Sequence, residues 1–261
     1  MMKNKKIKVE TPTSLLKGNK RRQFLKLSGM ALAGSGLLLA CSDDDDNILD
    51  PTDDTVDDGM GDDDGMGGTT PFDLGAGDLG VLNYAYALEQ LEAEFYTRVL
   101  NGTYWSGAAM EEKNILEALY NHEVNHREFF KAALNANFDA ELVLPAELEF
   151  DFGSVDFNNR DSVLNTAKTL EDTGVKAYNG AGKIIETVDY LLIAGKIVSV
   201  EARHAAAIRS IIGGDMGDFK LFAGDDAVSV GNGLDGAENP SVIIETAGAF
   251  FVTPFTANHL P

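Results

Sequence analysis

Apolar residues recur every three or four positions over four long stretches of this chain. That spacing places them on one face of an α-helix. We predict helices over residues 79–100, 107–135, 161–181 and 188–212. Asp78 is a candidate N-cap for the first of them. The pattern therefore indicates an all-α protein built around four long helices.

The segments between and after these helices differ in length and composition. Residues 102–107 read Gly-Thr-Tyr-Trp-Ser-Gly, which is typical of a short turn. Residues 136–159 form a long connection that contains Pro145 and several phenylalanines. The C-terminal extension, 216–261, is rich in Gly and Asp before it becomes apolar, and we predict a short helix near 240–251 that packs on the bundle.

Charged residues interrupt the apolar face of two of the predicted helices. Glu123 and His126 lie on the stripe of the second helix, and Glu201 and His204 lie on the stripe of the fourth. A spacing of three residues puts the carboxylate and the imidazole on the same side, about one turn apart. Each Glu-x-x-His pair could therefore hold one metal ion.

The chain also repeats itself around these pairs. Residues 83–96 align without gaps with 165–178, so that Asn83 matches Asn165 and Glu89 matches Glu171. Each half then supplies one Glu, followed 34 or 30 residues later by Glu-x-x-His. Two Glu and two Glu-x-x-His pairs are the inward-facing ligands of dinuclear carboxylate bundles. Two divalent cations would neutralise four carboxylates that are costly to bury alone.

Residues 75–215 resemble the ferritin-like superfamily, most closely its exported and desiccation-related branch. The resemblance rests on Leu-Glu-Ala-Glu-Phe-Tyr (91–96), Leu-Glu-Asp-Thr-Gly-Val (170–175) and Val-Glu-Ala-Arg-His-Ala-Ala (200–206). It implies a ferritin-like four-helix bundle with one long connection, 136–159, that crosses the bundle.

The resemblance also implies roles for the ligands. Glu123 and Glu201 match the bridging carboxylates, His126 and His204 match the terminal imidazoles, and Glu89 and Glu171 each match a ligand of one metal. Carboxylate oxygens with one nitrogen per ion suit iron or manganese, so the expected cofactor is two iron ions, or manganese.

The resemblance does not specify a single reaction. The favoured hypothesis is a redox enzyme that oxidises Fe²⁺ or reduces O₂ or peroxide. Manganese catalase is the second hypothesis within the enzyme class. The alternative is a non-enzymatic metal-binding or structural lipoprotein that serves stress tolerance. No residue is assigned a catalytic role.

Four residues near the ligands depart from the repeat or extend it. Glu92 lies one turn after Glu89, but its counterpart is Gly174, which could make room for Glu92 or for an oxidant. We expect Glu92 either to point outward or to lie behind the ligands, with a seventh-ligand role as the alternative. Tyr96 and Tyr178 each follow a ligand by seven residues and could relay electrons or hydrogen-bond ligands, or simply fill the core. His122 is expected to point away and not to bind metal.

The N-terminus resembles a twin-arginine lipoprotein signal over residues 1–41. Arg21-Arg22 precede an apolar run, 27–40, that is too short to span a bilayer. Leu38-Leu-Ala-Cys41 resembles a bacterial lipobox, and it makes Cys41, the one cysteine of the chain, the expected lipidated residue. We therefore expect a protein of the bacterial cell envelope, anchored in the membrane at its periplasmic or surface face.

The charge of the chain follows the same division. Of 21 Lys/Arg and 42 Asp/Glu, residues 1–41 hold nine and one, so the remainder carries 12 and 41, a formal net charge of −29. Twelve aspartates between Asp43 and Asp64 predict that 42–74 is a disordered acidic tether. This charge disfavours nucleic acid as a partner. A tether on each subunit also disfavours a closed 24-subunit cage, but it is compatible with a dimer.

Overall fold

The computed structural model describes residues 70–213, 221–222 and 224–261. Its frame consists of four long helices: α2 (Gly77–Asn101), α4 (Met110–Asn137), α5 (Arg160–Ala181) and α6 (Val188–Ile212). These bounds confirm the four predicted helices to within a few residues. Among the described residues, no helix is both long and apolar enough to cross a membrane.

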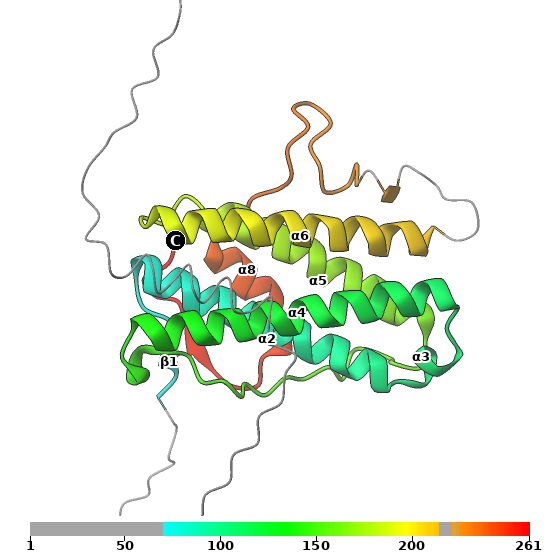
Figure 1. Cartoon of the computed structure of the whole chain (residues 1–261), viewed down its shortest axis with the longest axis horizontal. Helices are drawn as coiled ribbons and strands as arrows, with labels where there is room; N and C mark the ends of the chain where they lie inside the picture. The colour runs from blue at the N-terminus through cyan, green and yellow to red at the C-terminus, as the bar shows by residue number, and fades with distance from the viewer. Residues whose placement is uncertain (1–69, 214–220, 223) are drawn as a thin grey trace, which may run out of the picture.

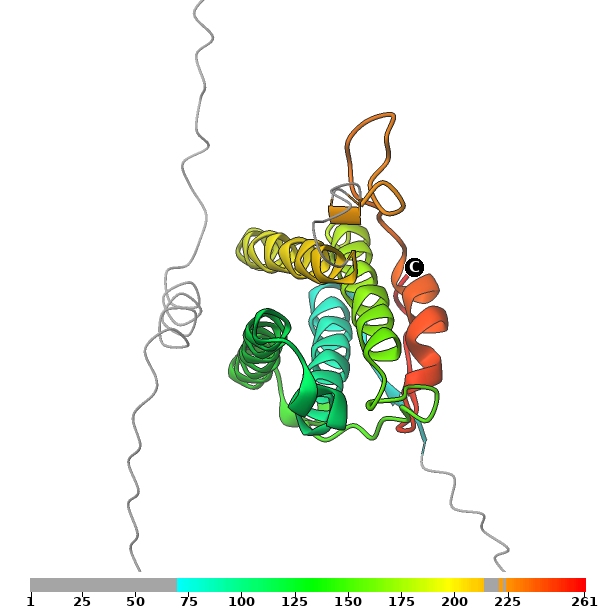
Figure 2. The same cartoon turned by 90° about the vertical axis from the view of Figure 1, so that its right-hand side faces the viewer.

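The four helices form two antiparallel pairs, α2 with α4 and α5 with α6 (Figure 1). Viewed after a quarter turn, they surround a common centre (Figure 2). Their buried apolar side chains form one core cluster there. Large side chains such as Tyr96, Leu116, Leu164 and Ile208 are fully buried there. The predicted all-α bundle is therefore confirmed, and its packing follows from the helical periodicity of apolar positions.

The long connection between α4 and α5 runs the length of α2. It includes the short η1 (Ala140–Leu142) and is fastened to α2 by two buried amide side chains. Asn83 donates to the carbonyls of Leu74 and Leu142 and accepts from the amide of Leu144. Gln90 donates to the carbonyl of Pro145, and near the end of α2 the amide of Tyr104 donates to Phe157. The connection thus returns the chain to the end of the bundle where α5 can begin parallel to α4.

The C-terminal extension packs on the bundle, as the sequence predicted. It contains α8 (Pro240–Ala247), which lies against α5, and the short η2 (Gly248–Phe250) (Figure 2). Gly180 of α5 permits this approach, because a Cβ there would overlap the carbonyl oxygen of Glu238. The extension ends with β2 (Phe255–Thr256), which pairs in parallel with β1 (Phe72–Asp73).

The pairing of β1 with β2 changes one expected boundary. Residues 70–74 were expected to belong to the disordered tether, yet Phe72 and Asp73 pair with the C-terminal strand and Leu74 is fully buried. The packed part of the chain therefore begins before residue 75. The signal, Cys41 and the rest of the acidic segment lie outside the described residues.

Two local predictions were wrong. Residues 102–107 are not simply a turn, since Thr103–Gly107 form the short helix α3. Asp78 does not cap α2, whose N-cap is Ala76. The Asp78 carboxylate accepts hydrogen bonds from the amides of Glu186 and Thr187 instead, so it ties the α5–α6 turn to the start of α2.

Candidate metal centre

Four glutamates meet at the centre of the bundle, one from each long helix. Their side chains are 0% exposed, although the helices around them are otherwise lined by apolar residues. They are Glu89 of α2, Glu123 of α4, Glu171 of α5 and Glu201 of α6. Both Glu-x-x-His pairs therefore have their glutamate inside the bundle and not on its surface.

The structure also brings both predicted histidines to these carboxylates. His126 joins Glu89, Glu123 and Glu201 in one cluster, and His204 joins Glu123, Glu171 and Glu201 in another. In each cluster the candidate ligand atoms lie within 4.8 Å of one another. Glu123 and Glu201 belong to both clusters, which is the position of a carboxylate shared by two ions.

The imidazoles face the carboxylates through the same ring nitrogen. Nδ1 of His126 lies 3.3 Å from Glu89 Oε2, 3.3 Å from Glu123 Oε2 and 3.1 Å from Glu201 Oε1. Nδ1 of His204 lies 2.7 Å from Glu123 Oε1, 3.3 Å from Glu171 Oε2 and 3.8 Å from Glu201 Oε2. Each nitrogen thus approaches three carboxylates at once, although one N–H can satisfy only one of them well.

Most of these atoms have no hydrogen bond within the described part of the chain. Atoms without a hydrogen bond there include an oxygen of each of Glu89, Glu123 and Glu171, both oxygens of Glu201, and Nδ1 of His204. The 2.7 Å approach of His204 Nδ1 to Glu123 Oε1 is close but does not have hydrogen-bond geometry. Leaving such groups unpaired is costly, and they converge from four helices on a common centre. A set of hard oxygens with one nitrogen per cluster fits divalent iron or manganese, so the residues present suit a dinuclear metal centre.

The electrostatics show how strained the cluster is when protons alone balance it. Burial raises the pKa of Glu171 to about 7, although His204 opposes that rise. Burial and the charge of Glu201 hold the pKa of Glu123 well above its usual range. Burial would also raise the pKa of Glu201, but contacts with the two imidazoles outweigh it and lower that pKa to about 2. The pKa values of these three carboxylates are therefore shifted unequally, although all three are glutamates.

The pKa values of both histidines are raised as well, which favours their charged forms. Burial lowers the pKa of His204, but the charge of Glu171 and contacts with the other carboxylates outweigh it and raise that pKa to about 12. Burial also lowers the pKa of His126, but the charge of Glu89 and contacts with the neighbouring carboxylates outweigh it, so the pKa is raised. Metal binding would have to displace these protons, because an imidazole binds metal in its neutral form.

Two tyrosines support the carboxylates from across the bundle. Tyr178 of α5 donates a hydrogen bond to Glu89 of α2, and Tyr96 of α2 donates one to Glu171 of α5. The sequence allowed these tyrosines either a contact with ligands or a core role, and the structure gives them both. Each hydroxyl engages Oε1 of its glutamate and leaves Oε2 directed at the cluster.

Glu92 is buried but belongs to neither cluster. Burial and the charges of Glu201 and Glu123 raise its pKa well above the usual range. Gly174 makes room for it, as the sequence suggested: a Cβ at 174 would lie 3.2 Å from Glu92 Oε1 and 3.4 Å from Glu201 Oε2. The structure therefore places Glu92 behind the ligands.

His122 has a place at the site that the sequence analysis missed. Its Nδ1 lies 2.8 Å from Nε2 of His204, and the two rings stack with their centroids 5.1 Å apart. It is not part of either cluster. The signal was present in the sequence, because His122 precedes His126 by four residues and so shares its side of α4. The residue that aligns with His122 before Glu201 is Val200, so the two halves of the site differ here.

Comparison with known proteins agrees with this geometry. A family model described as a ferritin-like domain matches residues 77–214, which is more than half of the chain and contains all six candidate ligands. No curated protein matches the chain.

Proposed function

The chain belongs to the ferritin-like domain family, and from that premise we propose that it binds two iron ions, or manganese, and uses them to reduce O₂ or peroxide. One observation carries the proposal: two buried Glu/His clusters share Glu123 and Glu201. Each cluster offers three carboxylates and one imidazole, which is a ligand set for hard divalent cations.

The six residues would bind the two ions in the arrangement that the family resemblance implies. Glu89 and His126 would complete one metal site, and Glu171 and His204 the other. Glu123 and Glu201 would bridge the two ions. The tyrosine hydroxyls would hold the outer carboxylates in the orientation that directs their free oxygens at the metal, as partners behind a ligand generally do.

Two ferrous ions held by these residues would supply two electrons, which with two protons reduce O₂ to H₂O₂, or H₂O₂ to two waters. The chain would provide a dry interior around that reaction, because all four bridging and outer carboxylates are fully buried. Burial raises the pKa of Glu92, which favours its protonated form beside the centre, where it could hold a proton near the ligands.

The location of the protein is a second part of the proposal. A twin-arginine signal would export the bundle already folded and loaded with metal, and lipidation of Cys41 would anchor it at the cell envelope through the acidic segment. The support is the arrangement of Arg21-Arg22, the apolar run and Leu38-Leu-Ala-Cys41 at the N-terminus.

The experiment is metal analysis of protein folded in the cytoplasm, followed by stopped-flow measurement of Fe²⁺ oxidation with O₂ or H₂O₂. We expect two ions per chain, and a loss of metal in the double variant Glu123→Ala/Glu201→Ala. The matched control is Glu94→Ala/Glu128→Ala, which removes two glutamates outside the clusters from the same kind of long helix. Unchanged metal content in the first variant would contradict the proposal.

The kinetic measurement separates the two function classes. Turnover with either oxidant supports the redox enzyme. Bound metal without turnover would instead favour a non-enzymatic metal-binding lipoprotein.

A further inference from the structure

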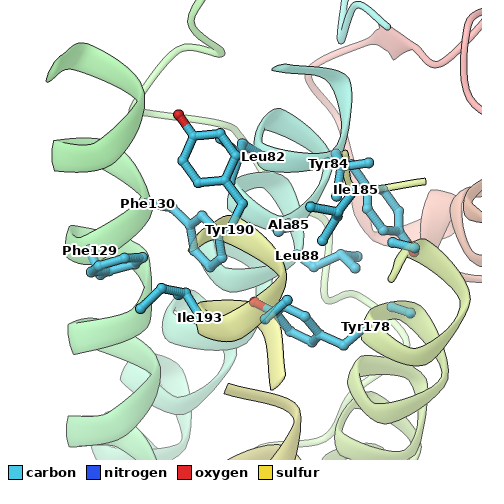
Figure 3. A pocket seen from close by; sticks show the side chains of 14 residues that line it. Leu82, Tyr84, Ala85, Leu88, Phe129, Phe130, Tyr178, Ile185, Tyr190 and Ile193 are labelled. Carbon is cyan, nitrogen blue, oxygen red and sulfur yellow. The ribbon is translucent and has the colours of Figure 1, made fainter. Parts of the chain in front are cut away.

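A small apolar cavity, partly open to the outside, lies among the four long helices next to the α5–α6 turn (Figure 3). All four long helices or their ends contribute to its wall. Figure 3 shows Leu82 and Leu88 of α2, Phe130 of α4, Tyr178 of α5 and Ile193 of α6 around it. Alanines at positions 85, 177, 181 and 194 complete the wall and leave the space open by their small size.

The cavity is close to the ligands on every helix. Ala85 and Leu88 precede Glu89 by four residues and one residue, and Phe130 follows His126 by four. A helix rises about 1.5 Å per residue, so the nearest wall residue of each helix lies within about two turns of the glutamate on that helix. Tyr178 belongs to both structures, because it lines the cavity and its hydroxyl donates to Glu89.

The size of the cavity limits what it can hold. The centres of water-sized molecules can occupy about 20 Å³ of it, whereas one water needs about 10–15 Å³ by the same measure. The space therefore suits one or two very small molecules. A peptide, a sugar or an aromatic ring would not fit without rearrangement.

The chemistry of the wall selects among small molecules. A buried water generally requires two to four polar partners. Apart from three tyrosines the side chains of the wall are apolar. The hydroxyl of Tyr178 is engaged with Glu89, and the hydroxyl of Tyr84, which is buried without a hydrogen bond among the described residues, offers one polar partner where a water needs at least two. Hydrogen peroxide and hydrated Fe²⁺ need still more polar contacts. Apolar cavities of this kind stay dry and accept xenon.

We propose that this cavity binds a small nonpolar gas molecule and that its occupant in the working protein is O₂, stored next to the metal centre. The identity of the gas rests on the proposed function, whereas the binding of a nonpolar gas does not. The cavity would deliver O₂ past Tyr178 and Glu89, and it would leave H₂O₂ to reach the centre by another route.

Xenon tests the cavity without any metal. Crystals of the metal-free wild-type protein under xenon pressure should show a xenon atom bounded by Leu88, Ala181 and Ile193. Ala85→Leu and Ala194→Leu both extend a side chain into the space and should remove that atom. Ala194 is half-buried, so its variant tolerates the larger residue if the buried Ala85 does not. Ala132→Leu, also half-buried but outside the wall, is the control and should keep the xenon site.

Stopped-flow oxidation of Fe²⁺-loaded protein tests the gas. Ala194→Leu should slow oxidation by O₂ several-fold and leave oxidation by H₂O₂ unchanged, and Ala132→Leu should change neither. Absence of xenon from the wild-type cavity would overturn the proposal even if Fe²⁺ is oxidised normally. An equal effect of Ala194→Leu on both oxidants would overturn O₂ as the occupant. Xenon binding in a protein that never oxidises Fe²⁺ would uphold the gas site and overturn both O₂ as its occupant and the proposed function.

Discussion

Tyr96 of α2 donates its hydroxyl hydrogen bond to Glu171 of α5, the outer glutamate of the opposite half of the repeat. Tyr178 reciprocates by donating to Glu89 of α2. Tyr96 and Tyr178 occupy aligned positions in the two halves, as do Glu89 and Glu171. The two halves of the repeat are therefore cross-linked: the tyrosine of each half donates a hydrogen bond to the candidate ligand of the other half.

This crossed arrangement predicts which metal site each tyrosine controls. Tyr178→Phe should lower the affinity for the ion held by Glu89 and His126, although Tyr178 lies on the same helix as Glu171. Tyr96→Phe should lower the affinity for the ion held by Glu171 and His204. Loss of such a partner lowers metal affinity by about 10- to 100-fold.

Metal titrations in double-mutant cycles check the assignment. Tyr178→Phe should be non-additive with His126→Ala and additive with His204→Ala. The reverse pattern would mean that each tyrosine acts on the ligand of its own helix, and the crossed arrangement would then be wrong.

His122 predicts a difference between the two metal sites. Its ring contacts Nε2 of His204 and so fixes the orientation of that imidazole. His122→Ala should weaken metal binding at the His204 site by about tenfold or more, while the His126 site is kept. The measurement is a two-site titration with Co²⁺ followed by its visible spectrum. Asn125→Ala, an exposed change on the same helix, is the control and should leave both sites unchanged.

Asn83 and Asn165 form a matched pair for stability. Asn83 is buried and satisfies three backbone groups, at Leu74, Leu142 and Leu144. Its alignment partner Asn165 is exposed and donates to Asp161, within its own helix. Asn83→Ala should lower the free energy of unfolding by about 3 kcal/mol, because it leaves buried peptide groups unpaired. Asn165→Ala should change it by about 0.5 kcal/mol or less.

Urea denaturation of the metal-free protein measures both asparagine variants. Equal and small effects would mean that the long connection holds to α2 without Asn83.

The metal-free protein should lose stability as pH rises from 5 to 7. Glu171 has a raised pKa of about 7 in the folded state, so its stabilising protonation is complete below about 4.5 and is lost as pH rises through 7. The raised pKa of Glu123 acts in the same direction, and the loss from one such group is about 1.4 kcal/mol per pH unit. The lowered pKa of Glu201 adds nothing in this range, because its effect is complete above about 4.5.

Thermal unfolding at pH 5 and pH 7, with and without Mn²⁺, checks this prediction. Without metal the melting temperature should fall by about 6 to 11 °C for each such group, since one group loses about 2.8 kcal/mol over two pH units and each 1 kcal/mol corresponds to about 2 to 4 °C in a protein of this size. With Mn²⁺ it should rise instead, because metal binds the deprotonated carboxylates. A metal-free protein that gains stability towards pH 7 would contradict the account of the buried cluster.

The sequence by itself determined the features that depend on geometry within one helix. The spacing of Glu123 and His126, and of Glu201 and His204, fixed which side chains share a face, because 3.6 residues complete a turn wherever the helix lies. Apolar periodicity located the four helices for the same reason. The repeat then indicated that Glu89 and Glu171 complete the set, and the structure brings all six residues together.

Only the tertiary structure decided which residues of different helices meet. Asn83 and Asn165 are equivalent in sequence, yet only Asn83 faces the long connection and becomes buried. Asp78 is a plausible cap in sequence, but the α5–α6 turn lies close enough to take its carboxylate. The crossed tyrosines, the contact of His122 with His204 and the pairing of β1 with β2 have the same origin. Such contacts depend on how helices are placed side by side, and no periodicity along a single segment encodes that placement.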